Sequence, residues 1–126
     1  MAAKEERRLD PDGHYSPEDL VVSSDVELPL ESGGRISDQL PAREILYRLV
    51  RERGGMTLAE LSREFAAIAP SAIRPPYAQE PEVYVLRLVA GDRSGVPPLA
   101  DFPSLVRHLA EHPATDADYG LSIRPA

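Results

Sequence analysis

Residues 37–70 read SDQLPAREILYRLVRERGGMTLAELSREFAAIAP, and this stretch carries the clearest structural signals of the chain. Apolar residues recur at helical spacing on both sides of Gly54-Gly55, which predicts two amphipathic helices joined by a glycine turn. Neither helix can bury its apolar stripe alone, so we expect the two to share a core. The stripes consist of Ala42, Ile45, Leu46, Leu49 and Val50 in the first helix and Leu58, Leu61, Phe65 and Ile68 in the second.

Polar residues mark where both helices are expected to begin. Ser37 and Asp38 are suited to cap the first helix, with Pro41 in its first turn, where a missing N–H costs little. Thr57 and Glu60 have the spacing of a capping box, in which each side chain accepts a hydrogen bond from the backbone N–H of the other residue. We therefore expect the second helix to begin directly after Thr57.

Composition limits the class of protein. The chain has 126 residues, which is enough for one domain, no cysteine and a formal net charge of −7. Without cysteine there are neither disulfides nor thiolate chemistry. The charged start of the chain does not resemble a signal peptide, and no apolar run approaches the roughly 20 residues of a membrane span. These features predict a cytoplasmic protein without membrane association.

Negative charge is concentrated in the first quarter of the chain. Residues 1–34 contain nine acidic and three basic side chains, and we expect them to form an acidic, largely flexible segment. Within this segment, residues 16–19 have a helix-start pattern that allows one or two turns. Residues 26–30 alternate like a strand that Pro29 would confine to a sheet edge. Residues 35–126 are predicted to form a single small domain.

The second half of the chain predicts further strands and a third helix. Residues 82–90 (EVYVLRLVA) are rich in β-branched residues and apolar on both alternating faces, which predicts a strand covered on both sides. Residues 96–99 and residues 119–123 are candidates for short strands. Asp101 is placed to cap a third helix that ends before Pro113. The predicted fold class is therefore α+β, with three main helices and a small antiparallel sheet.

Two sets of residues are candidates for binding a partner. Arg43, Tyr47 and Arg51 form a row at four-residue spacing on the polar face of the first helix, and tyrosine and arginine are enriched at interaction hot spots. The alternative is a tyrosine packed along its helix with the hydroxyl in water. Val83, Val85 and Arg87 lie on one face of the strand predicted over residues 82–90.

The predicted strand suggests how such binding would occur. The three predicted helices can cover one of its faces, but the remaining chain, rich in proline and acidic residues, is poorly composed to cover the other. We therefore expect the open face or an unpaired edge of this strand to serve self-association or partner binding. The competing possibility is that residues 26–30 or residues 119–123 pair with this strand and close the sheet.

Residues 108–112 read HLAEH, which resembles the His-x-x-Glu-His motif of inverted zinc peptidases. That resemblance implies metal binding by His108 and His112, with Glu111 as a base. It covers five residues, and the alternative is that both histidines lie at the end of a helix, where positive charge is favourable. The chain contains no glycine-rich phosphate loop and no nucleophile motif. We therefore expect neither a metal, nor a cofactor, nor catalysis.

Residues 38–100 resemble a winged helix-turn-helix domain in the order of their elements. The resemblance assigns residues 70–74 to the start of the recognition helix and residues 82–99 to the wing. It implies DNA binding, for which Arg63, Arg74 and Arg93 are the candidate contacts. Pro75 and Pro76 would end the recognition helix after about one turn.

These patterns support two hypotheses of function. The first is a non-enzymatic protein-interaction module that acts as an accessory or regulatory subunit. The alternative is a DNA-binding transcriptional regulator on a winged-helix scaffold. The only basic region, residues 35–74, has seven basic and five acidic side chains, a small surplus for binding to phosphates. The balance of charge therefore favours a protein partner over nucleic acid.

Overall fold

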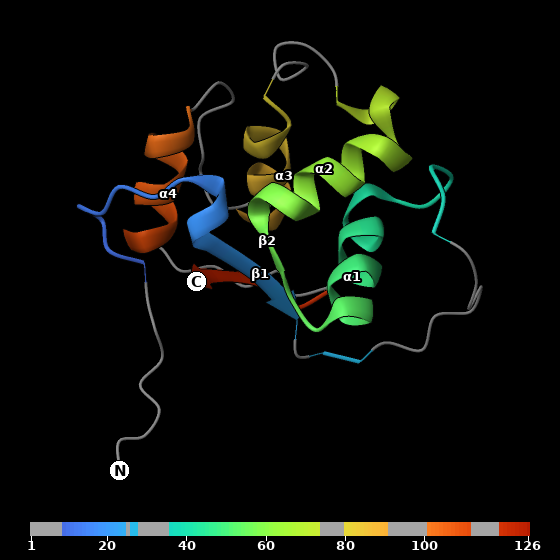
Figure 1. Ribbon diagram of the computed structural model, residues 1–126, viewed down its shortest axis with the longest axis horizontal. Coiled ribbons are helices and arrows are strands. Elements are labelled where there is room, and N and C mark those ends of the chain that lie inside the picture. The colour runs from blue at the N-terminus through green and yellow to red at the C-terminus, as the bar shows by residue number, and fades with distance from the viewer. Residues whose placement is uncertain (1–8, 25, 28–35, 74–79, 91–100, 112–118) are drawn as a thin grey trace.

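A computed structural model describes residues 9–24, 26–27, 36–73, 80–90, 101–111 and 119–126. Within these residues the chain forms four α-helices, two short 3-10 helices and three strands (Figure 1). The helices are α1 (Ala42–Arg53), α2 (Leu58–Ile68), α3 (Pro81–Ala90) and α4 (Phe102–Glu111), with 3-10 turns η1 (Pro17–Asp19) and η2 (Pro70–Ala72). The strands are β1 (Leu20–Ser24), β2 (Met56–Thr57) and β3 (Leu121–Pro125). The predicted α+β class with a small antiparallel sheet is confirmed.

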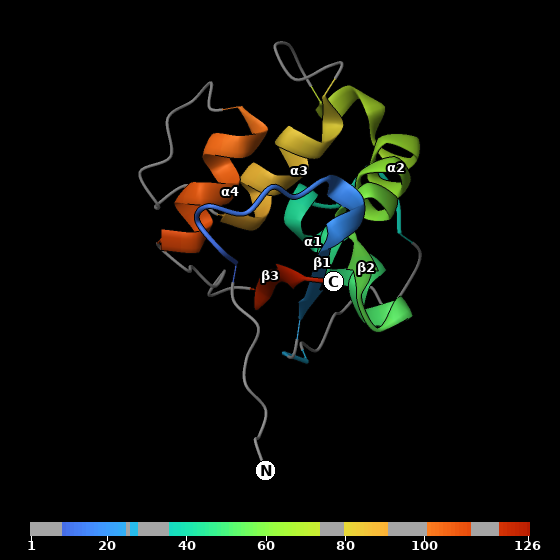
Figure 2. The same cartoon turned by 60° about the vertical axis from the view of Figure 1, so that its left-hand side comes forward.

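The sheet has the strand order β2-β1-β3, and both pairings are antiparallel. Val22 in the central strand lies opposite Met56 on one side and Ile123 on the other, so these three side chains share a face. Figures 1 and 2 show the helices gathered on one side of this sheet. Leu20 and Val22 are fully buried there, because alternate residues of a strand point to the same face.

The core lies between the helices and this face of the sheet. Each helix contributes its apolar stripe, and one contiguous cluster results. Its largest fully buried side chains are Phe65, Leu20, Ile45, Leu46, Leu58, Leu61, Leu86, Leu105 and Leu121. The shared core predicted for the two helices of residues 37–70 is thus confirmed.

The predicted helix ends are confirmed in most places. The backbone N–H of Glu60 donates to Thr57 Oγ1 at 3.1 Å, which is the threonine half of the predicted capping box. Gly54 ends α1 in the left-handed conformation with φ of 73°. The predicted caps of α1 were wrong: Pro41 is the residue before the first helical turn, and Ser37 and Asp38 belong to a turn upstream. In that turn Ser37 Oγ accepts from the backbone of Gln39.

The strand predicted over residues 82–90 was wrong, because these residues belong to α3. The buried residues of α3 include Val83, Leu86 and Val89 at three-residue spacing, with Ala90 one residue further on, which is the pattern of one helix face. Arg87 had already interrupted the alternating pattern of a strand. The first strand of the wing that the winged-helix resemblance assigns to this region is therefore a helix, and residues 91–99 lie outside the described residues.

Part of the first 34 residues packs in the core. The helix start predicted at residues 16–19 gives the single 3-10 turn η1, and the chain then enters β1. The Leu9 side chain belongs to the buried core cluster, and Tyr15 packs against that cluster. Val26 and Glu27 lie outside the three strands, and the remainder of the strand predicted over residues 26–30 lies outside the described residues.

The last two elements agree closely with the sequence. The backbone N–H of Ser104 donates to Asp101 Oδ1 at 2.9 Å, so Asp101 caps α4 as predicted. The strand predicted over residues 119–123 is β3, which begins two residues later and runs to Pro125. It pairs with β1 along all five residues of both strands.

Candidate interaction site

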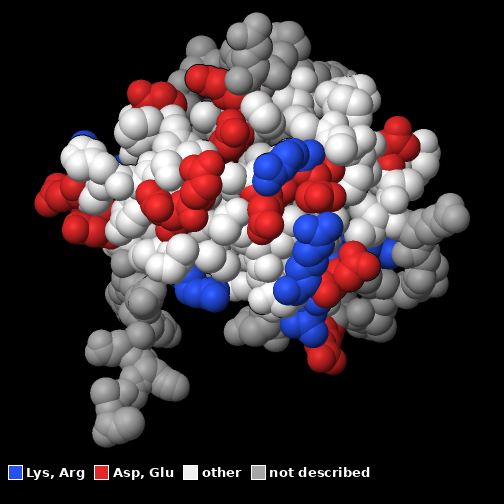
Figure 3. Space-filling model, in the orientation of Figure 1, with Lys and Arg blue, Asp and Glu red and all other residues white. Residues whose placement is uncertain are grey.

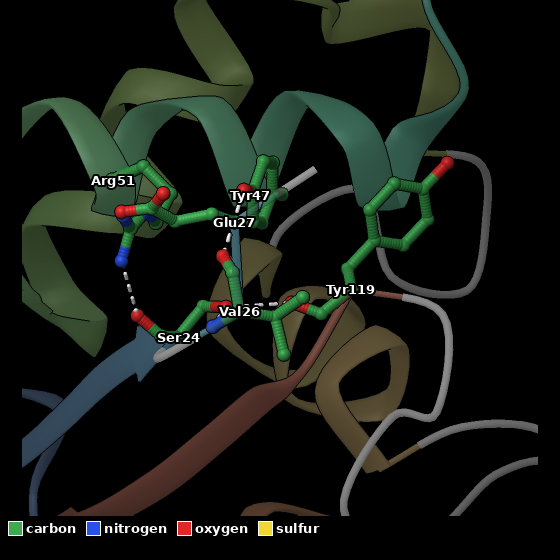
Figure 4. Close-up of polar contacts among 6 residues, drawn as sticks. All are labelled: Ser24, Val26, Glu27, Tyr47, Arg51 and Tyr119. Atoms are coloured by element: carbon green, nitrogen blue, oxygen red, sulfur yellow. Dashed lines mark hydrogen bonds and ion pairs between the residues drawn. The ribbon is translucent and has the colours of Figure 1, made fainter. Parts of the chain in front are cut away.

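Each side chain of the row formed by Arg43, Tyr47 and Arg51 donates to a backbone carbonyl of another segment; Tyr47 is buried, Arg43 is half-buried and Arg51 is exposed. Arg43 Nε donates to Leu88 O in the last turn of α3 at 3.1 Å. The Tyr47 hydroxyl donates to Val26 O at 2.8 Å, and Arg51 Nη1 donates to Ser24 O at 3.0 Å (Figure 4). The row therefore joins α1 to the end of α3 and to the chain that follows β1.

The contact of Arg51 follows from the shortness of β2. Ser24 and Val22 direct their backbone groups toward β2, but β2 has only two residues and reaches no further than Val22. The Arg51 guanidinium therefore satisfies a carbonyl that lies beyond the end of the β1–β2 ladder. Arg51 Nη2 also lies 3.2 Å from a carboxylate oxygen of Glu27, which is an exposed ion pair that contributes little stability.

Tyr47 is only 3 % exposed. Its ring lies against that of Tyr119, with centroids 5.8 Å apart and planes inclined by 43°. Ser24 donates from its hydroxyl to Tyr119 O at 2.6 Å, so both tyrosines are held at the point where β1 ends and β3 approaches (Figure 4). The Tyr47 hydroxyl consequently faces a protein carbonyl, where the sequence alternatives placed it in water or at a partner.

The other candidate interaction residues lie on α3 and not on an open strand. Val83 and Val85 are buried, and Val85 is completely inaccessible to solvent. Arg87 is half-buried and has its own polar contacts. Because a helix turns its apolar side toward the core, the face predicted to remain open does not form.

The residues that the two resemblances assign to metal binding and to DNA binding lie on different helices or outside the described residues. His108 is half-buried on α4, Glu111 is exposed at its end, and His112 lies outside the described residues. Across residues 9–24, 26–27, 36–73, 80–90, 101–111 and 119–126, no three acidic or histidine side chains are grouped as a metal site requires. Arg63 is exposed on α2, whereas Arg74 and Arg93 are not among the described residues.

The geometry of β3 reveals a feature that the sequence reading missed. β3 is at the edge of the sheet, and none of the described residues pairs with its outer side. The backbone N–H of Ala126 donates to Asp19 O at 2.8 Å, and these two residues continue the register of β1 with β3. Hydrogen-bonded pairs alternate along an antiparallel ladder, so Leu121, Ile123 and Pro125 direct their backbone groups away from β1.

Pro125 supports this assignment. Proline has no N–H to donate, so a strand accepts it where that position faces away from the neighbouring strand. Leu121 is fully buried, whereas Ile123 and Pro125 are partly exposed. Beyond the buried Leu121, the backbone groups that point outward from the edge are thus the N–H and carbonyl of Ile123 and the carbonyl of Pro125. Pro125, two residues beyond the strand predicted over residues 119–123, is the sequence signal that would have indicated an edge.

No family model, no curated protein and no solved structure matches the chain. No helix in the described part of the chain is long and apolar enough to cross a bilayer.

Proposed function

We propose that this chain is a non-enzymatic protein-interaction module, acting as an accessory or regulatory subunit, which binds an extended segment of its partner along the outer edge of β3. The observation that supports the proposal is the outward direction of the backbone groups of Ile123 and Pro125. Such an edge accepts an additional strand through main-chain hydrogen bonds. The segment would extend the sheet to the order β2-β1-β3-partner.

The rest of the fold suits this role. β3 is anchored along its inner side by pairing with all of β1, and its Leu121 side chain is buried in the core. An incoming strand therefore meets an edge that is already in its bound conformation, which lowers the entropic cost of association. Tyr47 and Arg51 of α1 donate to the carbonyls of Val26 and Ser24. The C-terminal end of the central strand β1 is therefore also held in place.

The test removes the backbone N–H of Ile123, which points away from β1. Ile123→Pro removes the outward N–H and leaves the hydrogen bonds between β1 and β3 in place, because residue 123 does not donate to β1. Ile123→Ala is the matched control, since it shortens the same side chain and keeps the N–H. Both variants and the unaltered protein are immobilised, and proteins captured from the native host are compared by mass spectrometry.

We expect a partner that is retained by the unaltered protein and by Ile123→Ala and is lost with Ile123→Pro. Circular dichroism shows whether the proline variant has kept its fold. Capture that is equal for the two variants, with both folded, would overturn the proposal. Self-association is tested with the same variants by light scattering at micromolar concentration.

A further inference from the structure

We propose that the strand received by β3 is basic, so that the partner offers an extended segment in which lysine or arginine alternates with apolar residues. This inference depends on the proposed binding at the edge of β3 and adds the chemistry of the partner. It follows from the charges that lie beside the edge.

The described residues before α1 carry acidic groups without basic ones. Residues 9–24 and 26–27 contain no lysine and no arginine, and their five carboxylates are exposed. These are Asp10, Asp12, Glu18, Asp19 and Glu27. In Figure 3 several acidic side chains lie among uncharged ones on the left part of the face, over η1 and the segment before it, and a basic side chain lies below them.

One residue of this acidic segment bonds to the C-terminal end of β3, while η1 itself packs against α2 and β2. Asp19 is bonded through its carbonyl to the backbone of Ala126, so η1 adjoins the C-terminal end of β3. In Figures 1 and 2 the segment before η1 crosses in front of α4, and in Figure 2 it runs above β3 to reach η1. A strand added to β3 would therefore end close to Asp19 and Glu18, whereas Glu27 lies beyond the other end of β1 and pairs with Arg51.

The basic residue of β3 is directed away from the edge. Arg124 Nη1 donates to Ser23 Oγ at 3.0 Å, and Ser23 belongs to the neighbouring central strand. The guanidinium thus points toward β1, on the face of the sheet that is turned away from the helices. It therefore does not point toward a strand that would pair with Ile123 and Pro125.

Asp19 keeps its negative charge at neutral pH. Its carboxylate accepts hydrogen bonds from the backbone N–H and the hydroxyl of Ser16, which lower the pKa of Asp19. Charges near an interface of this kind raise the association rate of an oppositely charged partner and exclude a partner of like charge. Both effects weaken as salt is added.

The experiment compares two fluorescently labelled seven-residue peptides with blocked ends. One alternates valine with lysine, and the other alternates valine with glutamate. Binding to the full chain is measured by fluorescence anisotropy at low and at physiological salt. We expect the lysine peptide to bind roughly tenfold or more tightly than the glutamate peptide, with a difference that shrinks as salt is added.

Two sets of variants separate the inference from the proposal on which it depends. Ile123→Pro should abolish binding of the lysine peptide, and Ile123→Ala should retain it. The exposed pair Asp12→Lys and Glu18→Lys together should reverse the preference between the peptides. Equal binding of both peptides, lost with Ile123→Pro, would overturn the basic preference and support binding at the edge.

The remaining outcomes are also decisive. Lysine-peptide binding that responds to the charge reversals but is the same for Ile123→Pro and Ile123→Ala would place the peptide on the acidic surface and overturn edge binding. If neither peptide binds to the unaltered protein at millimolar concentration, both the edge and its preference are rejected.

Discussion

α2 and α3 pack against each other, yet only α2 could be recognised as a helix from its sequence. Leu58–Ile68 begins after a capping threonine and is built largely from leucine, alanine, glutamate and arginine, which favour helices. Pro81–Ala90 contains three valines and a tyrosine, which favour strands. The rings of Phe65 and Tyr84 lie 6.0 Å apart where the two helices meet.

The difference shows how weak local preference is when packing opposes it. Propensities differ by a few tenths of a kcal/mol per residue, whereas full burial of one large apolar side chain contributes roughly 1.5–3 kcal/mol. Val85 and Leu86 are completely buried in α3. Burial of these side chains as a helix therefore outweighs the preference of valine for a strand.

The largest expected effect tests whether both helices depend equally on the core. Leu61→Ala in α2 and Leu86→Ala in α3 each remove a fully buried side chain. We expect each to lower the free energy of unfolding by about 2–5 kcal/mol, because the transfer energy is lost and a cavity remains. Urea denaturation followed by circular dichroism measures both. A near-neutral Leu86→Ala would contradict the packing of α3.

The parts of the fold that could be predicted are those with a local cause. The N-terminal ends of α2 and α4 could be predicted from Thr57 and Asp101, whose side chains accept hydrogen bonds from the backbone N–H three residues later. The identity of α3 could not be predicted, because its apolar residues fit both a buried helix and a buried strand. β1 was missed for a related reason: its five residues become a strand by pairing with β2 and β3, which lie far away in the sequence.

The candidate site shows the same limit. Helical spacing correctly placed Arg43, Tyr47 and Arg51 in one row, but the carbonyls that they bind are 21 to 45 residues away in the sequence. Periodicity reports which residues share a face and not what that face contacts. The outer edge of β3 is visible only after strand order and register are known.

A smaller effect is expected when the row of α1 is altered at Tyr47. Tyr47→Phe keeps the ring and removes the donor to Val26 O. The loss of a buried hydrogen bond is expected to lower the free energy of unfolding by about 1–2 kcal/mol. Tyr15→Phe is the matched control, since the Tyr15 hydroxyl accepts an exposed hydrogen bond from the backbone of Asp10. Equal effects of the two changes would contradict the buried role of Tyr47.

The smallest expected effect concerns the charge on the cap of α4. The hydroxyl and the backbone N–H of Ser104 lower the pKa of Asp101, because both favour the ionised carboxylate. A carboxyl group with a pKa that is lower in the folded state stabilises the fold above its unfolded pKa. That contribution is lost as the pH falls through the folded pKa. Acidification below the usual aspartate range should therefore remove it.

Asp101→Asn isolates this contribution, because asparagine also caps helices but does not titrate. We expect the stability difference between the unaltered protein and Asp101→Asn to be greatest near neutral pH and to shrink toward zero or reverse on acidification. All other carboxylates titrate in both proteins, so their effects cancel in the difference. Urea denaturation at several pH values provides the measurement. A difference that does not change with pH would show that the cap of α4 acts through geometry alone, as the uncharged Thr57 does for α2.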